Sequence, residues 1–325
     1  MSVLFDPYTL KGLTLKNRIM MSPMCQYQAQ EGRPSDWHLV HLGARAVGGV
    51  GLILFESTAV QEHARKSLDD LGLWSDEQIP AFRRVIDFCH QYGAKIGVQL
   101  AHSGGKSGVP GKNAEPDNVT VEEIADIVES FKASAVRALQ AGADTVEIHG
   151  AHGYLVNQFL SPLTNHRQDE YGGSMENRTR FALDVIAAVK SVLPADMPLF
   201  MRVSAVEYSD DGYDLEEMVE MVKLFKQAGV DIIDVSTGGN VPNAPEVYPG
   251  YQVPYAERIR HGAGVPTIAV GLLDSPQLAE EVLRNGRCDL VAIGRGLMRN
   301  AHWAKDAAIA LRVELEMPNT YKRAY

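Results

Sequence analysis

Eight short apolar segments rich in β-branched residues recur along the chain, and this repeat limits the possible folds more than any other feature. They cover residues 18–24, 51–57, 95–100, 145–150, 198–204, 231–237, 267–271 and 290–294. Segments with helical periodicity lie between them, over residues 75–92, 121–141, 177–192, 215–228, 275–285 and 301–315. The apolar segments lack a regular in-and-out alternation, which indicates strands buried on both faces, as in a parallel sheet.

The order of these segments predicts one closed architecture. Eight strand-then-helix units without a long linker predict a single (β/α)8 TIM barrel, one domain over residues 1–325. Residues 1–16 form a short N-terminal extension in this prediction, as a hairpin across the barrel bottom. A doubly wound open sheet is the alternative, and it is disfavoured because there are eight units and no GxGxxG follows the first strand.

The charge of the chain excludes two classes of partner. There are 31 Lys and Arg against 41 Asp and Glu, which gives a formal net charge of −10 at pH 7, and basic residues form no run. An acidic surface repels both nucleic acid and anionic membranes, so we expect neither as a partner.

Cysteine use and the first residues indicate the compartment. The three cysteines, Cys25, Cys89 and Cys288, have no paired spacing, which is typical of a reducing compartment. The first residues do not resemble a secretion signal, and no apolar run approaches the ~20 residues of a membrane span. We therefore expect a cytoplasmic protein.

Reactive side chains lie at and just after the carboxyl end of the fourth expected strand, the end of a TIM barrel at which function lies. They are His149, His152 and Tyr154. Two imidazoles and a phenol at one strand end predict hydrogen bonds to a substrate oxygen and delivery of a proton. The two histidines could instead ligate a metal, but no third ligand of compatible spacing is evident, and we expect no metal.

Two strand residues suit a bound cofactor. Gln99 ends the third expected strand, and Arg202 lies within the fifth. A guanidinium in an apolar strand needs an accepting partner. Glu207 and Asp210, just beyond it in the sequence, are the alternative partners in a purely structural ion pair.

Glycines end the last two strands, where barrels often bind phosphate on backbone N–H groups. Gly271 ends the seventh strand, and Gly294 with Arg295 ends the eighth. An arginine beside such glycines predicts a phosphate clamp. Together with the strand glutamine, the strand arginine and the His/His/Tyr set, this predicts non-covalently bound FMN as the group that carries the chemistry.

Five stretches of the sequence have characteristic residue combinations, and the fourth of them is too specific to arise by chance. They are LKNRIMMSPMCQY, DLGLWSDEQ, IGVQLAHSGGK, EIHGAHGYLVNQFLSPLTNHRQDEYGGSMENRTRF and AIGRGLMRN. They span nearly the whole chain, and they resemble the old yellow enzyme family of FMN-dependent ene-reductases, in its thermophilic-like branch. The resemblance implies an NADPH or NADH oxidoreductase that reduces activated C=C bonds of α,β-unsaturated carbonyl or nitro compounds.

The same resemblance implies roles for individual residues. Tyr27, His149 and His152 would hold the substrate, and Tyr154 would donate the proton. The residues implied to bind FMN are Ser22, Pro23, Met24, Cys25, Ser57, Gln99, Arg202, Gly294 and Arg295. Cys25 near the flavin ring would modulate the reduction potential, whereas a small buried side chain with a packing role is its alternative.

Two segments bear on substrate range and assembly. After Lys106 the family usually has a longer segment, whereas this chain has SGVPGKNAEPDNVTVEE, which we expect to alter the cap over the site. The tail NTYKRAY resembles that of the thermophilic-like branch, in which a matching arginine enters the neighbouring subunit's active site. The resemblance therefore implies a homodimer or homotetramer with Arg323 in a shared site, and a frayed terminus is the alternative.

Two other functions stay open from the sequence. One is a flavin-binding redox protein with another acceptor. The other is a metal-dependent TIM-barrel hydrolase or lyase that uses His149 and His152 as ligands.

Overall fold

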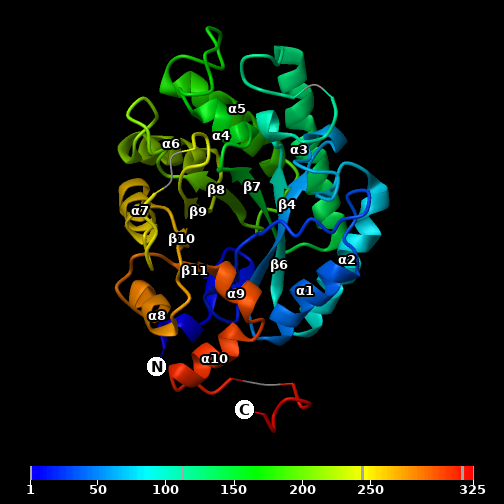
Figure 1. The fold of residues 1–325 in the computed structure, drawn as a ribbon, viewed down its shortest axis with the longest axis vertical. Coiled ribbons are helices and arrows are strands. Elements are labelled where there is room, and N and C mark those ends of the chain that lie inside the picture. The colour runs from blue at the N-terminus through cyan, green and yellow to red at the C-terminus, as the bar shows by residue number, and fades with distance from the viewer. Residues whose placement is uncertain (1, 112, 243–244, 316–317, 325) are drawn as a thin grey trace.

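A computed structural model describes residues 2–111, 113–242, 245–315 and 318–324 of the chain. Within these residues, eight parallel strands close into a barrel, because the first strand pairs with both the second and the last (Figure 1). In order around the barrel they are β3 (Ile19–Met21), β11 (Leu290–Ile293), β10 (Thr267–Ala269), β9 (Ile232–Ser236), β8 (Leu199–Ser204), β7 (Thr145–Gly150), β6 (Lys95–Ala101) and β4 (Leu52–Ala59). The predicted TIM barrel is confirmed, and the doubly wound alternative is wrong.

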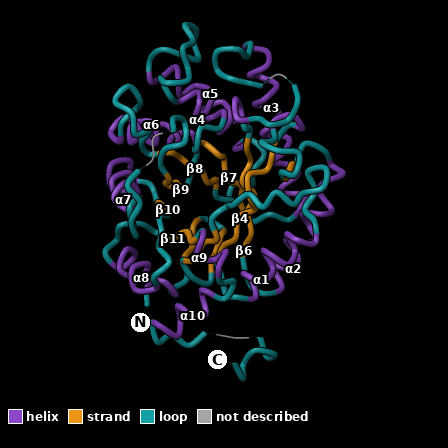
Figure 2. The backbone as a smooth tube through the Cα atoms, in the orientation of Figure 1, coloured by secondary structure: helices purple, strands orange, loops and turns teal. Residues whose placement is uncertain are grey.

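Helices form the layer around the strands (Figure 2). They are α1 (Asp36–Val47), α2 (Ile79–Gln91), α3 (Val121–Ala141), α4 (Leu155–Leu160), α5 (Met175–Lys190), α6 (Leu215–Ala228), α7 (Val253–Ile259), α8 (Pro276–Arg284), α9 (Arg295–Arg299) and α10 (Trp303–Ala310). A short strand, β5 (Leu71–Gly72), extends the sheet beside β4. Single helical turns complete the order: η1 (Val3–Phe5), η2 (Glu62–Ala64), η3 (Asp76–Gln78), η4 (Gly104–Lys106) and η5 (Arg260–Gly264). No helix of the described residues is long and apolar enough to cross a membrane.

Local sequence sets the ends of the helices. The Thr120 hydroxyl accepts a hydrogen bond from the Glu123 N–H at the start of α3, and Asp214 caps α6 in the same way. Gly142 and Gly229 end these two helices with φ of 99° and 113°, a left-handed conformation that favours glycine.

Helix α1 was not predicted, because its buried face is unusually polar. His38, His41 and Arg45 are buried, whereas Trp37 and Val40 are 51% and 69% exposed. Arg45 donates hydrogen bonds to the Leu297 carbonyl and so ties α1 to α9. A search for apolar residues at helical spacing therefore selects the exposed face of this helix instead of the buried one.

Two other predicted elements are longer than the observed ones. The first strand covers only residues 19–21 of the expected 18–24, and α10 ends at residue 310 instead of 315. Helix ends are the least certain part of a periodicity argument, since the pattern continues into the following turn.

The N-terminal extension closes the amino end of the barrel, as predicted. Strands β1 (Tyr8–Leu10) and β2 (Leu13–Leu15) form an antiparallel hairpin. Its turn binds the loops that precede β8 and β9, through Gly12 N–H to the Asp196 carbonyl at 2.8 Å and Lys11 to Asp231 at 2.6 Å. Its inward side chains join an apolar cluster inside the barrel: Leu13, Leu15, Met20, Leu52, Leu54, Phe200, Ile232, Ile268, Leu290 and Ala292.

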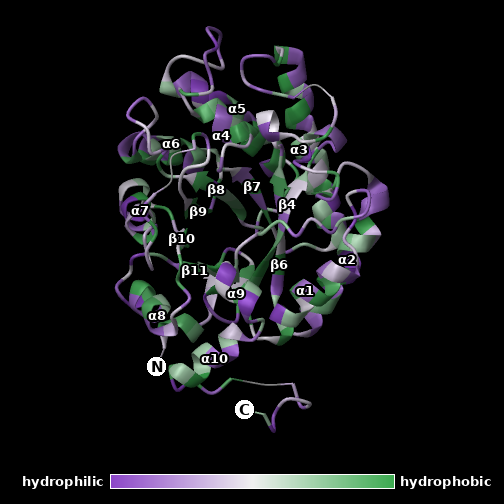
Figure 3. Cartoon of the chain, in the orientation of Figure 1, coloured by the Kyte–Doolittle hydropathy of each residue, from purple (hydrophilic) through white to green (hydrophobic). Residues whose placement is uncertain are grey.

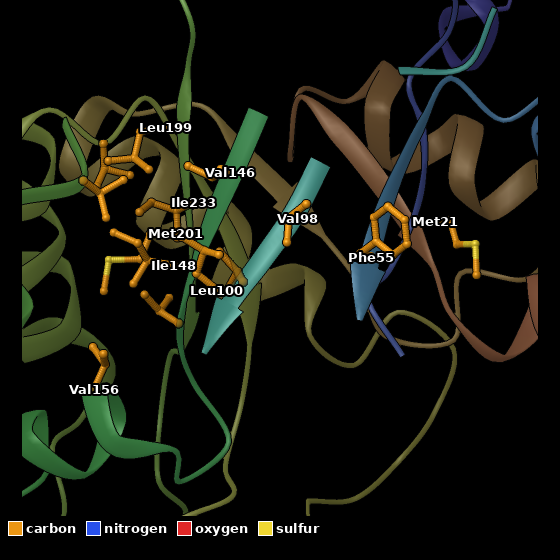
Figure 4. Packing of buried hydrophobic residues seen from close by; sticks show 14 of the residues in the cluster. Met21, Phe55, Val98, Leu100, Val146, Ile148, Val156, Leu199, Met201 and Ile233 are labelled. Carbon is orange, nitrogen blue, oxygen red and sulfur yellow. The ribbon is translucent and has the colours of Figure 1, made fainter. Parts of the chain in front are cut away.

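Successive strand residues face opposite layers. On β7 and β8, Val146, Ile148, Leu199 and Met201 pack in the outer cluster between strands and helices (Figure 4). The central strands are accordingly hydrophobic, while the helices alternate hydrophobic and hydrophilic residues (Figure 3). The intervening residues face the barrel interior, which changes from apolar at the hairpin to polar at the other end.

Candidate active site

A cavity of about 550 Å³, lined by both polar and apolar groups, opens at the carboxyl ends of the barrel strands. It brings together nearly all the residues predicted from the sequence. Those residues are Ser22, Pro23, Met24, Cys25, Tyr27, Ser57, Gln99, His149, His152, Tyr154, Arg202, Gly294 and Arg295. The ends of several strands that are distant in sequence therefore converge on one site, as a TIM barrel requires.

A smaller chamber of about 170 Å³ adjoins this cavity. Arg202, Gly294 and Arg295 line both spaces, and Gly271 lines only the smaller one. A Cβ atom at Gly271 would come within 3.1 Å of the Gln252 backbone nitrogen, so glycine keeps this chamber open. The two spaces together suit a planar group in the larger part and a compact anion beside an arginine in the smaller part.

His149 near the end of β7, and His152 and Tyr154 just after it, form a compact cluster. The ring centroids of His149 and His152 lie 5.3 Å apart, and those of His149 and Tyr154 lie 4.6 Å apart. His149 Nδ1 is buried without a hydrogen-bond partner, whereas His152 Nε2 lies 2.7 Å from the Ser236 hydroxyl. Both residues line the cavity, so their rings border the space that a ligand would occupy.

A hydrogen-bond network holds His152 in an unusual backbone conformation. Its φ is 61°, which is uncommon for a residue other than glycine. Its N–H donates to the Ser204 hydroxyl at 3.0 Å, and its carbonyl accepts from the Lys106 ammonium at 2.7 Å. The Ser204 hydroxyl in turn donates to the Gly238 carbonyl at 2.6 Å. Strain at one residue, maintained by several partners, is typical of a functional site.

Burial keeps this cluster uncharged. Desolvation lowers the pKa of both His149 and His152 well below the ordinary value, and Arg202 and Lys106 lower them further. Desolvation raises the pKa of Tyr154, against a smaller opposing effect of its hydrogen bond with Ser57. At neutral pH the site therefore offers neutral imidazoles and a protonated phenol.

The Cys25 thiol is also neutral. Burial raises its pKa to about 12, and the negative charge of Glu56 adds to this effect. Cys25 lies in the cavity wall, but a reactive thiolate is not supported there.

A layer of charged and polar side chains lies inside the barrel beneath the cavity. Gln99 donates to Glu147 Oε1 at 2.8 Å, and Arg202 Nε lies 3.2 Å from Asp234 Oδ2. The partners are neighbours in the strand register, and all four side chains are buried. Burial raises the pKa of both carboxyl groups, and Arg202 opposes this shift. Gln99 and Arg202, the two predicted cofactor-binding side chains, thus each lie beside a buried carboxyl group beneath the cavity.

The predicted structural partners of Arg202 are wrong. Glu207 instead accepts hydrogen bonds from Ser161 and Asn240, and Arg202 pairs with Asp234. A neighbouring strand provides the partner because Arg202 points into the barrel, which residues beyond the strand end do not reach.

Cationic and phenolic groups line the outer part of the cavity. Tyr27 is 41% exposed, and its hydroxyl accepts a hydrogen bond from Lys66 at 3.3 Å. Lys106 also lines the cavity, but its ammonium binds the His152 and Gly239 carbonyls. Arg323 lines neither cavity of its own chain, and the Tyr321 ring of the same tail packs on His302, which immediately precedes α10.

The metal hypothesis gains no support from the geometry. Among the residues that the structure describes, no group of three His, Cys, Asp or Glu side chains is arranged to hold a metal ion. A neutral imidazole pair beside a phenol suits hydrogen bonding to an organic ligand instead.

A TIM barrel with this two-part polar site defines the class of barrel enzymes that work through an organic cofactor. The sequence pattern of the NADH:flavin oxidoreductase / NADH oxidase family matches residues 3–314, and the chain belongs to this family. It is 50% identical over 339 residues to the NADPH dehydrogenase of Listeria welshimeri, covering 100% of both chains. It is likewise 50% identical over 338 residues to the NADPH dehydrogenase of Geobacillus thermodenitrificans, covering 100% of this chain and 99% of the relative.

Solved structures agree with this family. Morphinone reductase superposes with a TM-score of 0.81 at 27% sequence identity, and the match covers 98% of this chain and 92% of that one. The protein is therefore an oxidoreductase that uses FMN and a nicotinamide cofactor.

Sequence reasoning missed several residues in or beneath the site, among them Glu147, Asp234 and Lys66. Glu147 and Asp234 lie two positions before His149 and Ser236 on their strands, so the two-residue period of a strand placed them on the same inner face. A carboxylate inside an apolar strand was the available signal. Lys66 lies in the loop after β4, and no sequence pattern indicated that it reaches the cavity.

Proposed function

We propose that the chain, as one FMN-binding barrel over residues 1–325, is an ene-reductase that reduces α,β-unsaturated carbonyl or nitro compounds with NADPH or NADH. The observation that carries this proposal is the neutral pair His149 and His152 beside Tyr154, in a cavity that also contains the predicted cofactor residues. A site that polarises an oxygen and supplies a proton from a phenol suits addition of hydride and proton across a C=C bond.

The histidines bind the activating oxygen in this proposal. A neutral imidazole carries one N–H, so each ring donates one hydrogen bond to the carbonyl or nitro oxygen. These bonds draw electron density from the double bond and make its β-carbon electrophilic. When bound, FMN would supply the hydride, with the nicotinamide cofactor as its source.

Tyr154 donates the proton to the α-carbon. Its raised pKa keeps the phenol protonated at neutral pH, and its ring lies beside the His149 ring that binds the substrate oxygen. Arg202, with Asp234 beside its guanidinium, would stabilise the negative charge that the bound cofactor carries when reduced.

The cofactor-binding set is part of the same proposal. It comprises Ser22, Pro23, Met24, Cys25, Ser57, Gln99, Arg202, Gly271, Gly294 and Arg295. Its support is their common location in the two adjoining cavities.

Assembly and location complete the proposed function. We infer a homodimer or homotetramer in the cytoplasm, in which Arg323 reaches the neighbouring subunit's substrate. The support is an exposed apolar patch formed by Trp37, Val40 and Met298, which are 51%, 69% and 49% exposed beside a hollow of about 210 Å³. Such patches are typical of interfaces between proteins.

Tyr154→Phe tests the reaction. The variant keeps the ring and loses the proton, so cyclohexenone reduction should slow by about 10²-fold or more, within the usual range for a general acid. Reduction of a nitroalkene should slow less, because a nitronate can leave and be protonated in solution. Flavin content should stay normal.

Tyr92→Phe is the matched control. This tyrosine is 37% exposed and is not among the residues lining the cavity, so its replacement should leave cyclohexenone turnover unchanged. Equal cyclohexenone activity of Tyr154→Phe and the parent would exclude Tyr154 as the acid. A parent protein that oxidises NADPH but reduces neither substrate would refute the ene-reductase proposal.

A further inference from the structure

Lys66 gives the outer part of the cavity an ammonium group that the proposed reaction does not use. The residue lines the cavity together with Tyr27 and Lys106. Its ammonium donates to the Tyr27 hydroxyl at 3.3 Å and lies 5.8 Å from the centre of the Tyr27 ring. The Lys106 ammonium is already bound to two backbone carbonyls, so the two lysines are not equivalent.

The backbone of Lys66 is fixed although its side chain is exposed. Its N–H donates to Asp70 Oδ2 at 2.8 Å, and its carbonyl accepts from Gly108 N–H at 2.9 Å. Ser107 also donates to the Arg65 carbonyl, so the segment after Lys106 packs directly against the Lys66 loop. This arrangement directs the ammonium to the cavity instead of leaving it on a free loop.

Asp70 does not neutralise this ammonium. Its carboxylate accepts hydrogen bonds from the backbone N–H groups of Lys66 and Ser67 and from the Ser67 hydroxyl. Within the described parts of the chain, no ion pair is formed by the Lys66 ammonium. The hydrogen bond to Tyr27 raises the pKa of Lys66, so the side chain is charged at neutral pH.

Tyr27 and Lys66 can bind one anion together. Because the Tyr27 oxygen accepts from the ammonium, its own hydrogen is available to a further acceptor. The ammonium has two more hydrogens. A phenol and an ammonium 3.3 Å apart therefore match the two oxygens of a carboxylate.

We propose that the preferred substrates of this site carry a carboxylate beyond the activated double bond, and that Tyr27 and Lys66 bind it. This inference rests on the proposed function and specifies its substrate class. The phosphate groups of the nicotinamide cofactor present the same anionic chemistry, and the experiments below distinguish the two sources.

Two substrates of equal shape test whether the negative charge of the substrate is recognised. 4-Oxopent-2-enoate and its primary amide both present an enone, and only the first is an anion. Lys66→Gln should lower kcat/KM for the acid by about threefold to tenfold, the range expected for a charge-assisted contact that water partly screens. The effect should lie mainly in KM. For the amide, kcat/KM should change by less than about twofold.

Two further variants control for structure and for net charge. Lys66→Arg keeps the charge and should retain the preference for the acid. Lys132→Gln removes one charge from an exposed α3 residue that is paired with Glu129, and it should affect neither substrate. Equal losses for acid and amide in Lys66→Gln would overturn the proposal, because the side chain would then act through the structure of the loop.

Ligand binding provides a readout independent of turnover. 4-Hydroxybenzoate and 4-hydroxybenzamide can be titrated into the FMN-loaded protein and followed by the flavin absorbance. Lys66→Gln should weaken binding of the benzoate by about threefold to tenfold and leave the benzamide within about twofold. If the protein reduces no enone but shows this discrimination, the ene-reductase function fails and the carboxylate site stands.

The nicotinamide cofactor is the remaining source of an anion. Lys66→Gln could instead raise the KM for NADPH and leave the ratio of kcat/KM for the acid to that for the amide unchanged. That result would assign the ammonium to the phosphates of the dinucleotide and overturn the substrate proposal. Unchanged discrimination between benzoate and benzamide would overturn it as well.

Discussion

Replacing Asp234 by Asn tests whether the buried carboxylates hold Arg202 beneath the cavity. Arg202 Nε lies 3.2 Å from Asp234 Oδ2, and the side chains are 8% and 0% exposed. At an effective dielectric constant of ~20, unit charges at this distance attract by about 5 kcal/mol. The actual loss is smaller, because Glu147 remains as a second carboxylate and Asp234 is one of the groups that raise its pKa. Once Asp234 is neutral, Glu147 ionises more readily beside Arg202.

We therefore expect Asp234→Asn to lower the free energy of unfolding by about 2–3 kcal/mol, below the ~3–5 kcal/mol typical of a buried charge left alone. Urea unfolding of the FMN-free protein measures this without a contribution from bound ligand. Asp76→Asn is the control, since Asp76 is 81% exposed in its pair with Arg137 and such pairs contribute at most about 1 kcal/mol.

A double variant separates stability from binding. Arg202→Met with Asp234→Leu replaces the pair by apolar side chains, which is often neutral or stabilising for a buried ion pair. It should regain stability relative to Asp234→Asn and bind FMN weakly. If the urea midpoint of Asp234→Asn equals that of the parent, and the double variant is no more stable than Asp234→Asn, the Arg202–Asp234 pair does not stabilise the buried polar layer.

Three further predictions concern the thiol, the buried histidines and the tail. Cys25→Ala should keep the fold and shift the flavin reduction potential by about 20 mV, the equivalent of ~1 kcal/mol for a two-electron couple, and an identical potential in spectroelectrochemistry would leave the thiol a packing role. Burial lowers the pKa of His41 to about 3 in the folded protein, whereas its pKa in the unfolded chain is near 6.5. Below pH 6.5 the unfolded chain therefore binds a proton that the folded protein does not, and the free energy of unfolding falls as the pH decreases. His41→Gln should reduce that slope by about 1.4 kcal/mol per pH unit between pH ~5.5 and ~4, and equal slopes in urea titrations would contradict the shift. Deletion of residues 319–325 should raise the KM for enones about threefold to tenfold and leave FMN bound, whereas a parent that sediments as a monomer would reject a shared site.

The strand order was predictable because burial on both faces leaves a strong sequence signal. The eight apolar segments, the capped helices and the residues at the strand ends all followed from local patterns. Helix α1 did not, since its buried face contains His38, His41 and Arg45 and its exposed face contains Trp37 and Val40. Such a helix is recognised only when the partner that satisfies its buried arginine is known.

The site was predictable where residues share a strand end and not where they meet across strands. His149, His152 and Tyr154 are close in sequence, so their cluster followed directly. The pairing of Arg202 with Asp234 depends on strand register, and the approach of Lys66 to Tyr27 depends on how two loops pack. Neither kind of information is present in a local pattern.

The hairpin covers the amino end of the barrel, and the cavity opens at the carboxyl ends of the strands, where Tyr27 and Lys66 are part of its lining. An electron donor and an acceptor that both bind in this cavity must occupy it in turn. Steady-state kinetics should then give parallel lines in double-reciprocal plots. An excess of the donor or of the acceptor should inhibit turnover, because it binds the oxidation state of the enzyme that reacts with the other compound.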